Sequence, residues 1–438
     1  MAVAAVDTNQ RDAGLLRAVG PWTLAASTVC NVVGAGIFAV PGALAASVGS
    51  YAPLALLVCA LAVGSVAICF AEGGSRIASS GGSYAYVAAA FGPLAGFVAG
   101  VLSWFGNILA CGGVAAALAD VAVSLLPGPW QPAMHALVIV VVIGGIAWVN
   151  VGGVVRGMRL VSAATMVKLI PLMIFVVVGA TAIHADNFAQ AVTLSTAGLG
   201  RALILALFAF TGMETSLAAS GEVAQPARTI PRALLLAMLI VTLLYVAIQV
   251  VAQGILGPAL AASTVPLADA MNRVSPALRL LMLAGAAISM FGLMSIELLG
   301  GPRILFAFAR DGLLPSLLGR VHARSHAPHM AIICHALIAI VLALTGTFVE
   351  LAVLSTLAVA PLYIGGSVAA WWLARRGVAE TGKPLNFRWL GTAVIVAAVS
   401  MLVLIALASR AEITGLLAVM ASSCVLGFLL LRWRTVAP

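Results

Sequence analysis

Three ionisable side chains lie within long apolar stretches of the sequence. Lys168 stands in TMVKLIPLM, Glu214 in FAFTGMETS and Glu297 in LMSIELLGG. A charged group in hydrocarbon surroundings is costly, so such residues are by default candidates for holding a ligand, an ion or a proton. The elements that carry these three residues decide which of these tasks each one can perform.

The stretch STVCNVVGAGIFAVPG, residues 27–42, interrupts the first long apolar run. Gly34 and Gly36 each cost a helix interior about 1 kcal/mol relative to alanine. Asn31 can hydrogen-bond freed backbone groups, and Pro41 fits the first turns of a helix that restarts. Close packing of two helices through small residues is the other explanation of such a glycine pair.

A second interruption lies in FAFTGMETS, where Thr211 and Gly212 precede Glu214. Serine and threonine hydroxyls compete for backbone hydrogen bonds. Because lipid cannot satisfy the backbone of a broken helix, a break persists only where it packs in protein or lines a cavity. Two interruptions at corresponding places predict an inverted repeat with a binding site between its halves.

The composition is that of a membrane protein. The 438 residues are 63% hydrophobic and 8% charged, whereas a soluble domain has about 25% charged residues. Apolar runs long enough to cross a bilayer recur along the chain and predict an all-helical polytopic membrane protein with about twelve transmembrane helices. The expected spans are 21–48, 52–77, 93–124, 133–151, 160–183, 200–222, 231–255, 276–307, 329–347, 349–374, 388–408 and 412–432.

These spans group into one predicted architecture. After a cytoplasmic tail at 1–20, residues 21–374 form a core of five plus five spans in inverted repeats, with the first and sixth spans discontinuous. Residues 375–387 form a cytoplasmic loop. Residues 388–438 hold the last two spans and a short cytoplasmic C-terminus.

The distribution of basic residues orients the chain. With the N-terminus inside, most Lys and Arg residues fall in inner segments; the outer side holds Arg201, Arg273, Arg279 and Arg410. The positive-inside rule then predicts a multi-pass cell-membrane protein with both termini in the cytoplasm. Basic inner loops account for the net charge of +9, so the expected partner is the lipid bilayer and not nucleic acid.

The same orientation gives the two breaks opposite polarity. The outer half of span 1 starts near Gly36 and presents free N–H groups, while the outer half of span 6 ends near residues 210–211 and presents free C=O groups. Helix N-termini attract anions and C-termini attract cations. A ligand with a carboxylate beside an ammonium group fits both ends, which predicts an amino acid.

Four segments carry a family resemblance: GAGIF followed by Pro41, AEGGSRIASSGGSYAYVAAAFG (71–92), FAFTGMETSLAASGEVAQPARTIPRAL (208–234) and PRILFAFARDGLLP (302–315). In these segments the chain resembles amino acid permeases of the amino acid–polyamine–organocation superfamily. Among them it is similar to the basic amino acid/polyamine antiporter branch and to general proton-coupled permeases. The resemblance implies the LeuT-type fold and transport by alternating access.

The resemblance also implies a substrate site. It places the substrate carboxylate on the span 1 backbone at 35–37 and the ammonium group on nearby carbonyls of spans 1 and 6. In arginine/agmatine antiporters a tryptophan covers the substrate at the position of Phe208; phenylalanine keeps the ring but lacks the indole N–H, so arginine specificity does not carry over. The substrate-binding residues expected in this way are Asn31, Val32, Ala35, Gly36, Ile37, Phe208, Thr211, Gly212 and Glu297.

The resemblance suggests a role for each of the three ionisable residues in the apolar stretches. Lys168 matches a lysine that stands where sodium binds in sodium-coupled cousins, which implies sodium independence; a lysine that snorkels to the interface is the alternative. Glu214 is the candidate for proton coupling or gating, or else a structural carboxylate. Glu297 replaces an aromatic residue of the antiporter branch, and it can pair with a cationic substrate, with Lys168 or with a proton.

A cytoplasmic gate is expected at the inner ends of spans 2, 6 and 8. Glu72 and Glu222 lie there near several arginines, including Arg303. An inner network of ion pairs would close the path to the cytoplasm, and a solvated loop is the alternative.

The sequence indicates no cofactor and no metal. His322, His326 and His329 lie among arginines and prolines without a cysteine or carboxylate, and the six cysteines form no CxxC pair. No nucleophile–base pair or HExxH pattern is present, so we do not expect an enzyme.

The predicted function is therefore secondary active amino acid transport, proton-coupled and sodium-independent, with a cationic amino acid or amine as substrate. An exchanger for neutral amino acids and a membrane sensor that binds without transport are the alternatives. A channel would lack the paired breaks. The oligomeric state is open and includes a homodimer.

Overall fold

A computed structural model of the protein describes residues 19–77, 83–124, 130–152, 168–189, 194–217, 223–310, 312–325, 327–380 and 382–436. Apart from an isolated parallel bridge between Val19 and Val223, these residues form helices, turns and loops. The predicted all-helical class is confirmed.

The α-helices are α2 (Pro21–Val32), α3 (Gly36–Val48), α4 (Ala52–Arg76), α5 (Ser83–Phe91), α6 (Pro93–Val123), α7 (Gln131–Val151), α9 (Leu169–Gly179), α10 (Thr196–Phe210), α11 (Met213–Leu217), α12 (Pro226–Leu256), α13 (Pro266–Asn272), α14 (Pro276–Arg310), α15 (His329–Thr345), α16 (Phe348–Arg375), α17 (Leu390–Ala406) and α18 (Arg410–Val436). Short 3-10 helices are η1 (Gly49–Tyr51), η2 (Ala180–Ala182), η3 (Ala185–Phe188), η5 (Gly257–Ala262) and η6 (Ser316–Gly319). Proline at the first or second helical position opens several of them, because its fixed φ suits a helix start and its missing N–H has no partner there.

Seven helical stretches among the described residues are long and apolar enough to cross a bilayer. They comprise α3 with α4, α6, α7, α12, α14, α16 and α18, and the shorter apolar helices are α9, α10, α15 and α17. Each predicted span contains at least one of these helices. The sequence prediction missed α5 and α13, which are short helices in the connections, while the start of the fifth span at 160–167 lies outside the described residues.

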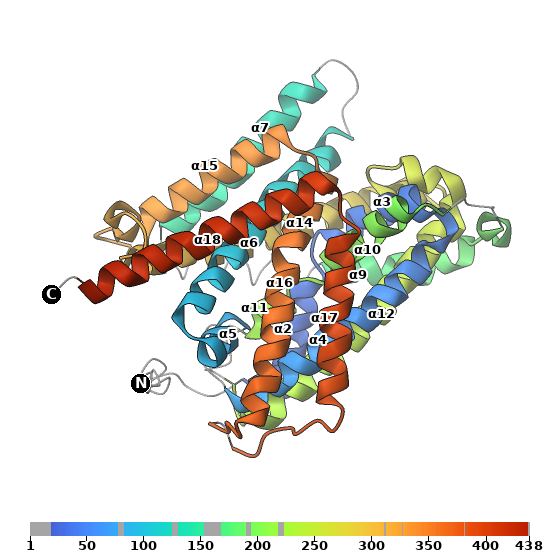
Figure 1. Ribbon diagram of the computed structural model, residues 1–438. Coiled ribbons are helices and arrows are strands. Elements are labelled where there is room, and N and C mark those ends of the chain that lie inside the picture. The colour runs from blue at the N-terminus through green and yellow to red at the C-terminus, as the bar shows by residue number, and fades with distance from the viewer. Residues whose placement is uncertain are drawn as a thin grey trace.

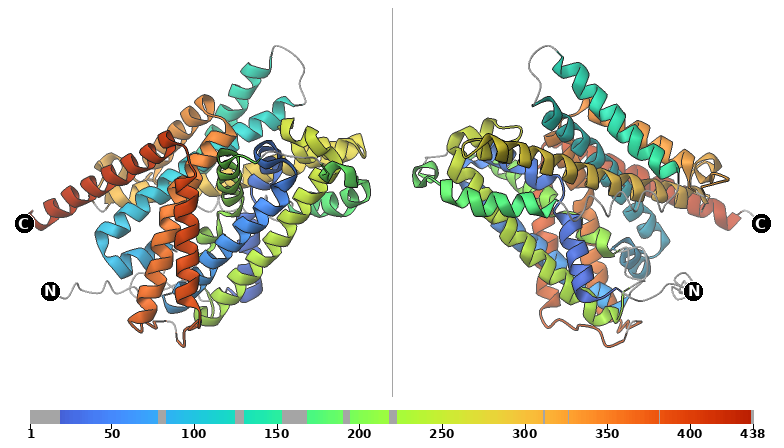
Figure 2. Two further views of the ribbon diagram at one scale, coloured as in Figure 1. Left: turned by 45° about the vertical axis from the view of Figure 1, so that its right-hand side comes forward. Right: turned by 180° about the vertical axis from the view of Figure 1, so that it is seen from behind.

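The helices pack so that two broken elements lie next to each other. The pieces α2 and α3 contact α10, α11 and α12, and α12 also packs along α4. In Figures 1 and 2, α4 and α12 lie side by side, while α6, α7, α15 and α18 form a second group of obliquely running helices. Helix α16 joins the groups because it packs against both α4 and α6.

Burial separates central helices from peripheral ones. In the most apolar window of α16, 67% of residues are buried inside the protein, against 17% for α18. Helix α18 therefore presents most of its apolar surface outward, as expected of a lipid-facing helix. The central position of α16 brings its side chains to the site described next.

Candidate functional site

The first break separates α2, which ends at Val32, from α3, which begins at Gly36. Buried hydroxyls from other helices bind the carbonyls that the break frees. Tyr245 of α12 donates its phenolic hydroxyl to the Val32 carbonyl at 2.8 Å, and Ser289 of α14 donates to the Gly34 carbonyl at 3.1 Å. Side chains from two neighbouring helices thus provide hydrogen-bond partners for carbonyl groups that the interruption leaves without helical partners.

Lys168, which immediately precedes α9, contacts the end of α2 at this break. Its side chain is buried, and its Nζ donates a hydrogen bond to the Cys30 carbonyl in the last turn of α2. The carbonyl end of a helix carries partial negative charge, so this ammonium group sits where a cation is favoured. Lys168 is therefore a fixed part of the break and does not snorkel to an interface.

The second break separates α10, which ends at Phe210, from the short helix α11. Thr211 donates its hydroxyl to the Phe208 carbonyl at 2.7 Å, and its N–H points to the same oxygen at 3.3 Å. Gly212 follows with φ of +111°, a conformation that L side chains rarely adopt. The break expected in the sixth span is therefore present at the predicted residues.

Gly36 of the first break and Gly212 of the second each lie close to the backbone of the other interrupted segment. A Cβ on Gly36 would lie 3.1 Å from the Cα of Ala209, and a Cβ on Gly212 would lie 2.9 Å from the Asn31 carbonyl oxygen. Both positions need glycine for close approach, and Gly212 needs it for its φ as well. Small residues thus let the two breaks meet.

Glu214 is tied to the second break. Its Oε2 accepts a hydrogen bond from the Gly212 N–H at 3.1 Å and another from the Tyr363 hydroxyl of α16 at 2.7 Å. A carboxylate that accepts two donors fixes the turn and links it to the central helix. The same oxygen can change its hydrogen bonding if the carboxylate takes up a proton.

A cavity of about 90 Å³ lies between the breaks and the helices α6, α14 and α16, with room for several water molecules. Its polar lining includes two carboxylates, Glu214 and Glu297, and no Lys or Arg is among the lining residues that the structure describes. The lining residues are Asn31, Val32, Gly34, Gly36, Ser103, Gly106, Asn107, Ala110, Phe208, Ala209, Thr211, Gly212, Glu214, Leu293, Ile296, Glu297, Ser355, Val359 and Leu362.

Most of the predicted substrate residues line this cavity together. Ala35 in the first break and Ile37 in the first turn of α3 are the exceptions, because both are buried and neither is part of the lining. Gly36, which lies between them, is part of the lining. Phe208 forms one wall, and its ring meets that of Phe348 edge-on at 5.6 Å.

Glu297 is held by an amide from a facing helix. Asn107 of α6 donates its Nδ2 to the Oε2 of Glu297. Behind this pair lies a buried imidazole, since Trp104 donates its Nε1 to His335 Nδ1 at 3.2 Å and a Cβ on Gly301 would collide with both Asn107 and His335. In this conformation Glu297 bonds to Asn107 and Lys168 to Cys30, so the pairing of Glu297 with Lys168, one of three sequence alternatives, is not observed.

Sequence reasoning missed the side chains that support the site. Tyr245, Ser289, Tyr363 and Asn107 all bind residues of the breaks or the cavity carboxylates. A signal was present, because a tyrosine or asparagine inside an apolar run needs a hydrogen-bond partner when it is buried. The sequence does not say which partner that is.

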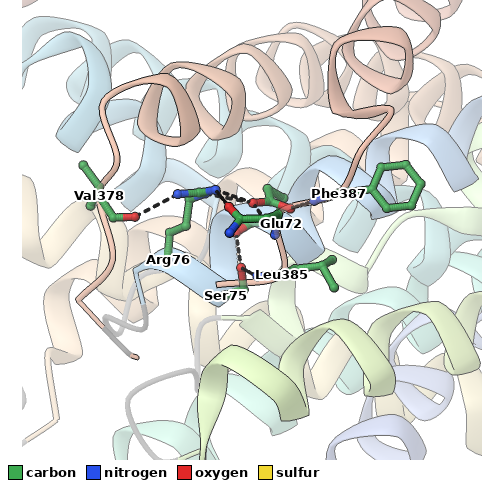
Figure 3. Close-up of polar contacts among 7 residues, drawn as sticks. Glu72, Ser75, Arg76, Val378, Leu385 and Phe387 are labelled. Carbon is green, nitrogen blue, oxygen red and sulfur yellow. Dashed lines mark hydrogen bonds and ion pairs between the residues drawn. The ribbon is translucent and has the colours of Figure 1, made fainter. Parts of the chain in front are cut away.

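The C-terminal end of α4 carries a polar cluster that includes Glu72 of the predicted gate (Figure 3). Glu72 accepts hydrogen bonds from Arg76 Nε at 2.9 Å and from the backbone N–H groups of Asn386 and Phe387 at 3.2 and 2.9 Å. Arg76 donates in turn to the Val378 carbonyl at 3.0 Å and to the Asn386 side chain at 2.6 Å. The pair thus binds the loop between α16 and α17.

Among the described residues, this conformation shows part of the expected gate network. Glu222 lies outside the described residues, and Arg303 on α14 forms no ion pair with Glu72. The physical reason is that the α16–α17 loop returns over the end of α4 and directs two backbone N–H groups at the Glu72 carboxylate. Arg76, four residues along the same helix and one of the arginines near Glu72, forms the ion pair with Glu72.

No group of three or more His, Cys, Asp or Glu side chains that could hold a metal occurs in the part of the chain that the structure describes. Of the three loop histidines, His326 lies outside that part. His322 Nδ1 accepts from the Ser325 N–H at 3.3 Å.

Comparison with known proteins gives one family. A family model described as amino acid permease matches residues 19–431. The chain is 32% identical over 320 residues to the uncharacterized transporter Rv1979c of Mycobacterium tuberculosis, an alignment that spans 66% of each chain. It is 26% identical over 339 residues to two Bacillus subtilis proteins, the branched-chain amino acid permease BcaP (72% of each chain) and the methylthioribose transporter (74% of each chain).

Proposed function

The chain belongs to the amino acid permease family, a family of membrane transporters and not of enzymes, and on this premise we propose that it is a secondary active transporter of a small amine-bearing molecule. The proposed architecture is the LeuT-type fold, with about twelve spans and a five-plus-five inverted repeat. Transport would proceed by alternating access around the two breaks.

One observation carries the proposal. The breaks between α2 and α3 and between α10 and α11 contact each other and line one cavity with polar walls. The first break brings the start of α3 to this cavity, and the second brings the carbonyl end of α10. A substrate carboxylate at the first end and an ammonium group at the second would each meet complementary helix dipoles.

The proposed substrate class is a cationic amino acid or an amine. Glu214 and Glu297 contribute two carboxylates to the cavity, and its described lining holds no Lys or Arg that would compensate them. A positively charged substrate side chain or a second amino group would satisfy Glu297, which here is bound by Asn107. The names of BcaP and the methylthioribose transporter support the rival proposal, a substrate without net charge.

We propose sodium independence because of Lys168. Its ammonium group already sits on the carbonyl end of α2, at the Cys30 oxygen, where a bound cation would otherwise be favoured. A fixed ammonium group there removes the need for an added metal ion.

We propose that Glu214 couples transport to protons. It lies between the Gly212 N–H and the Tyr363 hydroxyl, so it links the second break to α16. Protonation of Glu214 would remove its charge and make it a donor, which changes both contacts. Exchange of one amino acid for another without net proton movement is the second coupling mode that the test below distinguishes.

Uptake into proteoliposomes tests these proposals together. The panel contains lysine, arginine, putrescine, alanine, leucine and methylthioribose, with choline in place of sodium in one arm. Faster uptake of the cationic compounds with acid outside and without sodium supports the proposal. Uptake that requires sodium, or that favours leucine and needs internal substrate, would replace it with an ion-coupled or a neutral-exchange mechanism.

A further inference from the structure

A second cleft lies away from the cavity between the breaks, where α16 ends and α17 begins. Its volume is about 270 Å³, and it lies next to the Glu72–Arg76 pair and the loop that this pair binds. The cleft is lined by Glu72, Arg76, Trp371, Ala374, Arg375, Asn386, Phe387, Arg388, Leu390 and Gly391.

Two of the lining side chains are exposed arginines that have no carboxylate partner among the described residues. Arg375 and Arg388 form no ion pair with another described residue. Their guanidinium groups lie against tryptophan rings, Arg375 at 4.9 Å from the Trp371 centroid and Arg388 at 5.7 Å from the Trp389 centroid. Glu72 does not neutralise them, because Arg76 and two backbone N–H groups already bind its oxygens.

Arginine guanidinium groups bind phosphate strongly, since their planar N–H groups match phosphate oxygens. Stacking on a tryptophan leaves the edge of the guanidinium, where its N–H groups are, free for an anion. We propose that this cleft binds the phosphate of an anionic phospholipid head group, with Arg375 and Arg388 as its ligands.

The surface beside the cleft favours a lipid over a free phosphate ion. Trp389 is 64% exposed, and Ile395, Val399 and Leu402 of α17 are 65%, 52% and 56% exposed. Spacings of four and three residues place these three on one face of the helix. Tryptophan beside an apolar helix face is typical of the membrane interface, so acyl chains can lie along α17 while the phosphate meets the arginines.

The charge of the segment and its side of the membrane agree with this ligand. Between residues 371 and 391, Arg375, Arg376, Lys383 and Arg388 oppose Glu380 alone. The positive-inside distribution assigns this segment to the cytoplasmic leaflet, which is the leaflet where anionic lipids attract juxtamembrane basic residues.

Native mass spectrometry of the full-length protein tests the proposal. The protein is released from mixed phosphatidylcholine and phosphatidylglycerol nanodiscs, and the retained lipids are counted. Wild type should retain phosphatidylglycerol in preference to phosphatidylcholine. Arg375→Gln/Arg388→Gln should lower that preference at least tenfold, because it removes both guanidinium groups that bind the phosphate.

The matched control is Arg376→Gln/Lys383→Gln, which removes the same charge from the same segment but from outside the cleft. It should keep the preference for phosphatidylglycerol. Equal loss in both double variants would mean diffuse attraction and would overturn the site, as would an unchanged preference in Arg375→Gln/Arg388→Gln.

A thermal-shift arm distinguishes the two sources of phosphate. Phosphatidylglycerol should raise the melting temperature of wild type, and inorganic phosphate should not. Stabilisation by inorganic phosphate alone would overturn the lipid assignment. Single Arg388→Gln, whose side chain is exposed, provides a second variant in case the double variant folds poorly.

Discussion

At the scale of single residues, the two cavity carboxylates differ in their surroundings. Glu214 is bound by a backbone N–H of the break and by Tyr363, so its contacts change if the break moves. Glu297 is bound by the side chain of Asn107, which projects from an unbroken helix. These contacts support our proposals that Glu214 acts in coupling and Glu297 in substrate selection.

Substitution of Glu297 tests substrate selection. Glu297→Gln keeps the shape of the side chain and removes its charge, so lysine and putrescine should compete less well against a neutral amino acid for uptake. A loss of roughly tenfold or more in relative affinity is expected for a partly buried charge pair, whose removal costs about 1.5–3 kcal/mol. Competition assays in proteoliposomes measure it, and an unchanged order of competitors would contradict the assignment.

Substitution of Glu214 tests coupling. Wild-type uptake should rise when the outside is acidic, because a proton then enters with the substrate. Glu214→Gln cannot release a proton, so its uptake should become insensitive to the pH gradient while counterflow of substrate persists. Tyr363→Phe serves as the comparison, since it removes one hydrogen bond of Glu214 but leaves the carboxylate; it should shift the pH dependence without abolishing it. A Glu214→Gln protein that still responds to the gradient would exclude this role.

At the scale of elements, the breaks were predictable and their supports were not. Glycine, asparagine and threonine inside apolar runs weaken a helix locally, and these residues mark the breaks at Gly36 and Gly212. The hydroxyl of Tyr245 that binds the first break comes from a residue 213 positions away along the chain. Such contacts depend on how helices pack, which local sequence patterns do not specify.

The second break gives a prediction for a single glycine. Gly212→Ala should lower uptake at least tenfold, because alanine at a φ of +111° is strained by about 1–3 kcal/mol and its Cβ would press on the Asn31 carbonyl. Gly145→Ala in α7 is the matched control, since nothing lies within 4 Å of the added Cβ. That variant should transport normally, with a stability gain of up to about 1 kcal/mol. Equal uptake by the two variants would show that the break does not need its glycine.

The α16–α17 loop gives a prediction about Glu72. Glu72→Gln leaves buried Arg76 without its carboxylate, a change that costs about 3–5 kcal/mol for a buried pair. The loop should then detach, and trypsin should cut faster at Arg376 or Arg388. Asp186→Asn, an exposed carboxylate in η3, should leave cleavage unchanged. The sequence could not show this contact, because Glu72 and Asn386 are 314 residues apart.

At the scale of the whole molecule, hydropathy predicted the helical class and the order of the helices well. A run of about 20 apolar residues has few alternatives to a membrane helix. The short helices α5 and α13 escaped prediction because they lie in connections and lack that length. The cavity arises only when α16, α6 and α14 close around the breaks, so its lining could be predicted for the breaks but not for Ser103, Asn107 or Ser355.

The orientation of the chain is also a property of the whole molecule. If the positive-inside distribution holds, the α16–α17 loop faces the cytoplasm. Trypsin should therefore cut this loop at Arg376 or Arg388 in inside-out vesicles and leave the loop intact in right-side-out vesicles. Cleavage from the outside would reverse the assignment and would place the proposed lipid site in the outer leaflet.

The central claim is that two facing breaks form a site that carries its ligand across the membrane. The direct measurement compares equilibrium binding of a radiolabelled ligand from the panel in detergent with its time course of uptake into proteoliposomes. The account predicts saturable binding together with saturable uptake above the empty-liposome background, both lost in Gly212→Ala. Saturable binding by wild type without any flux would contradict it and would identify a sensor instead of a transporter.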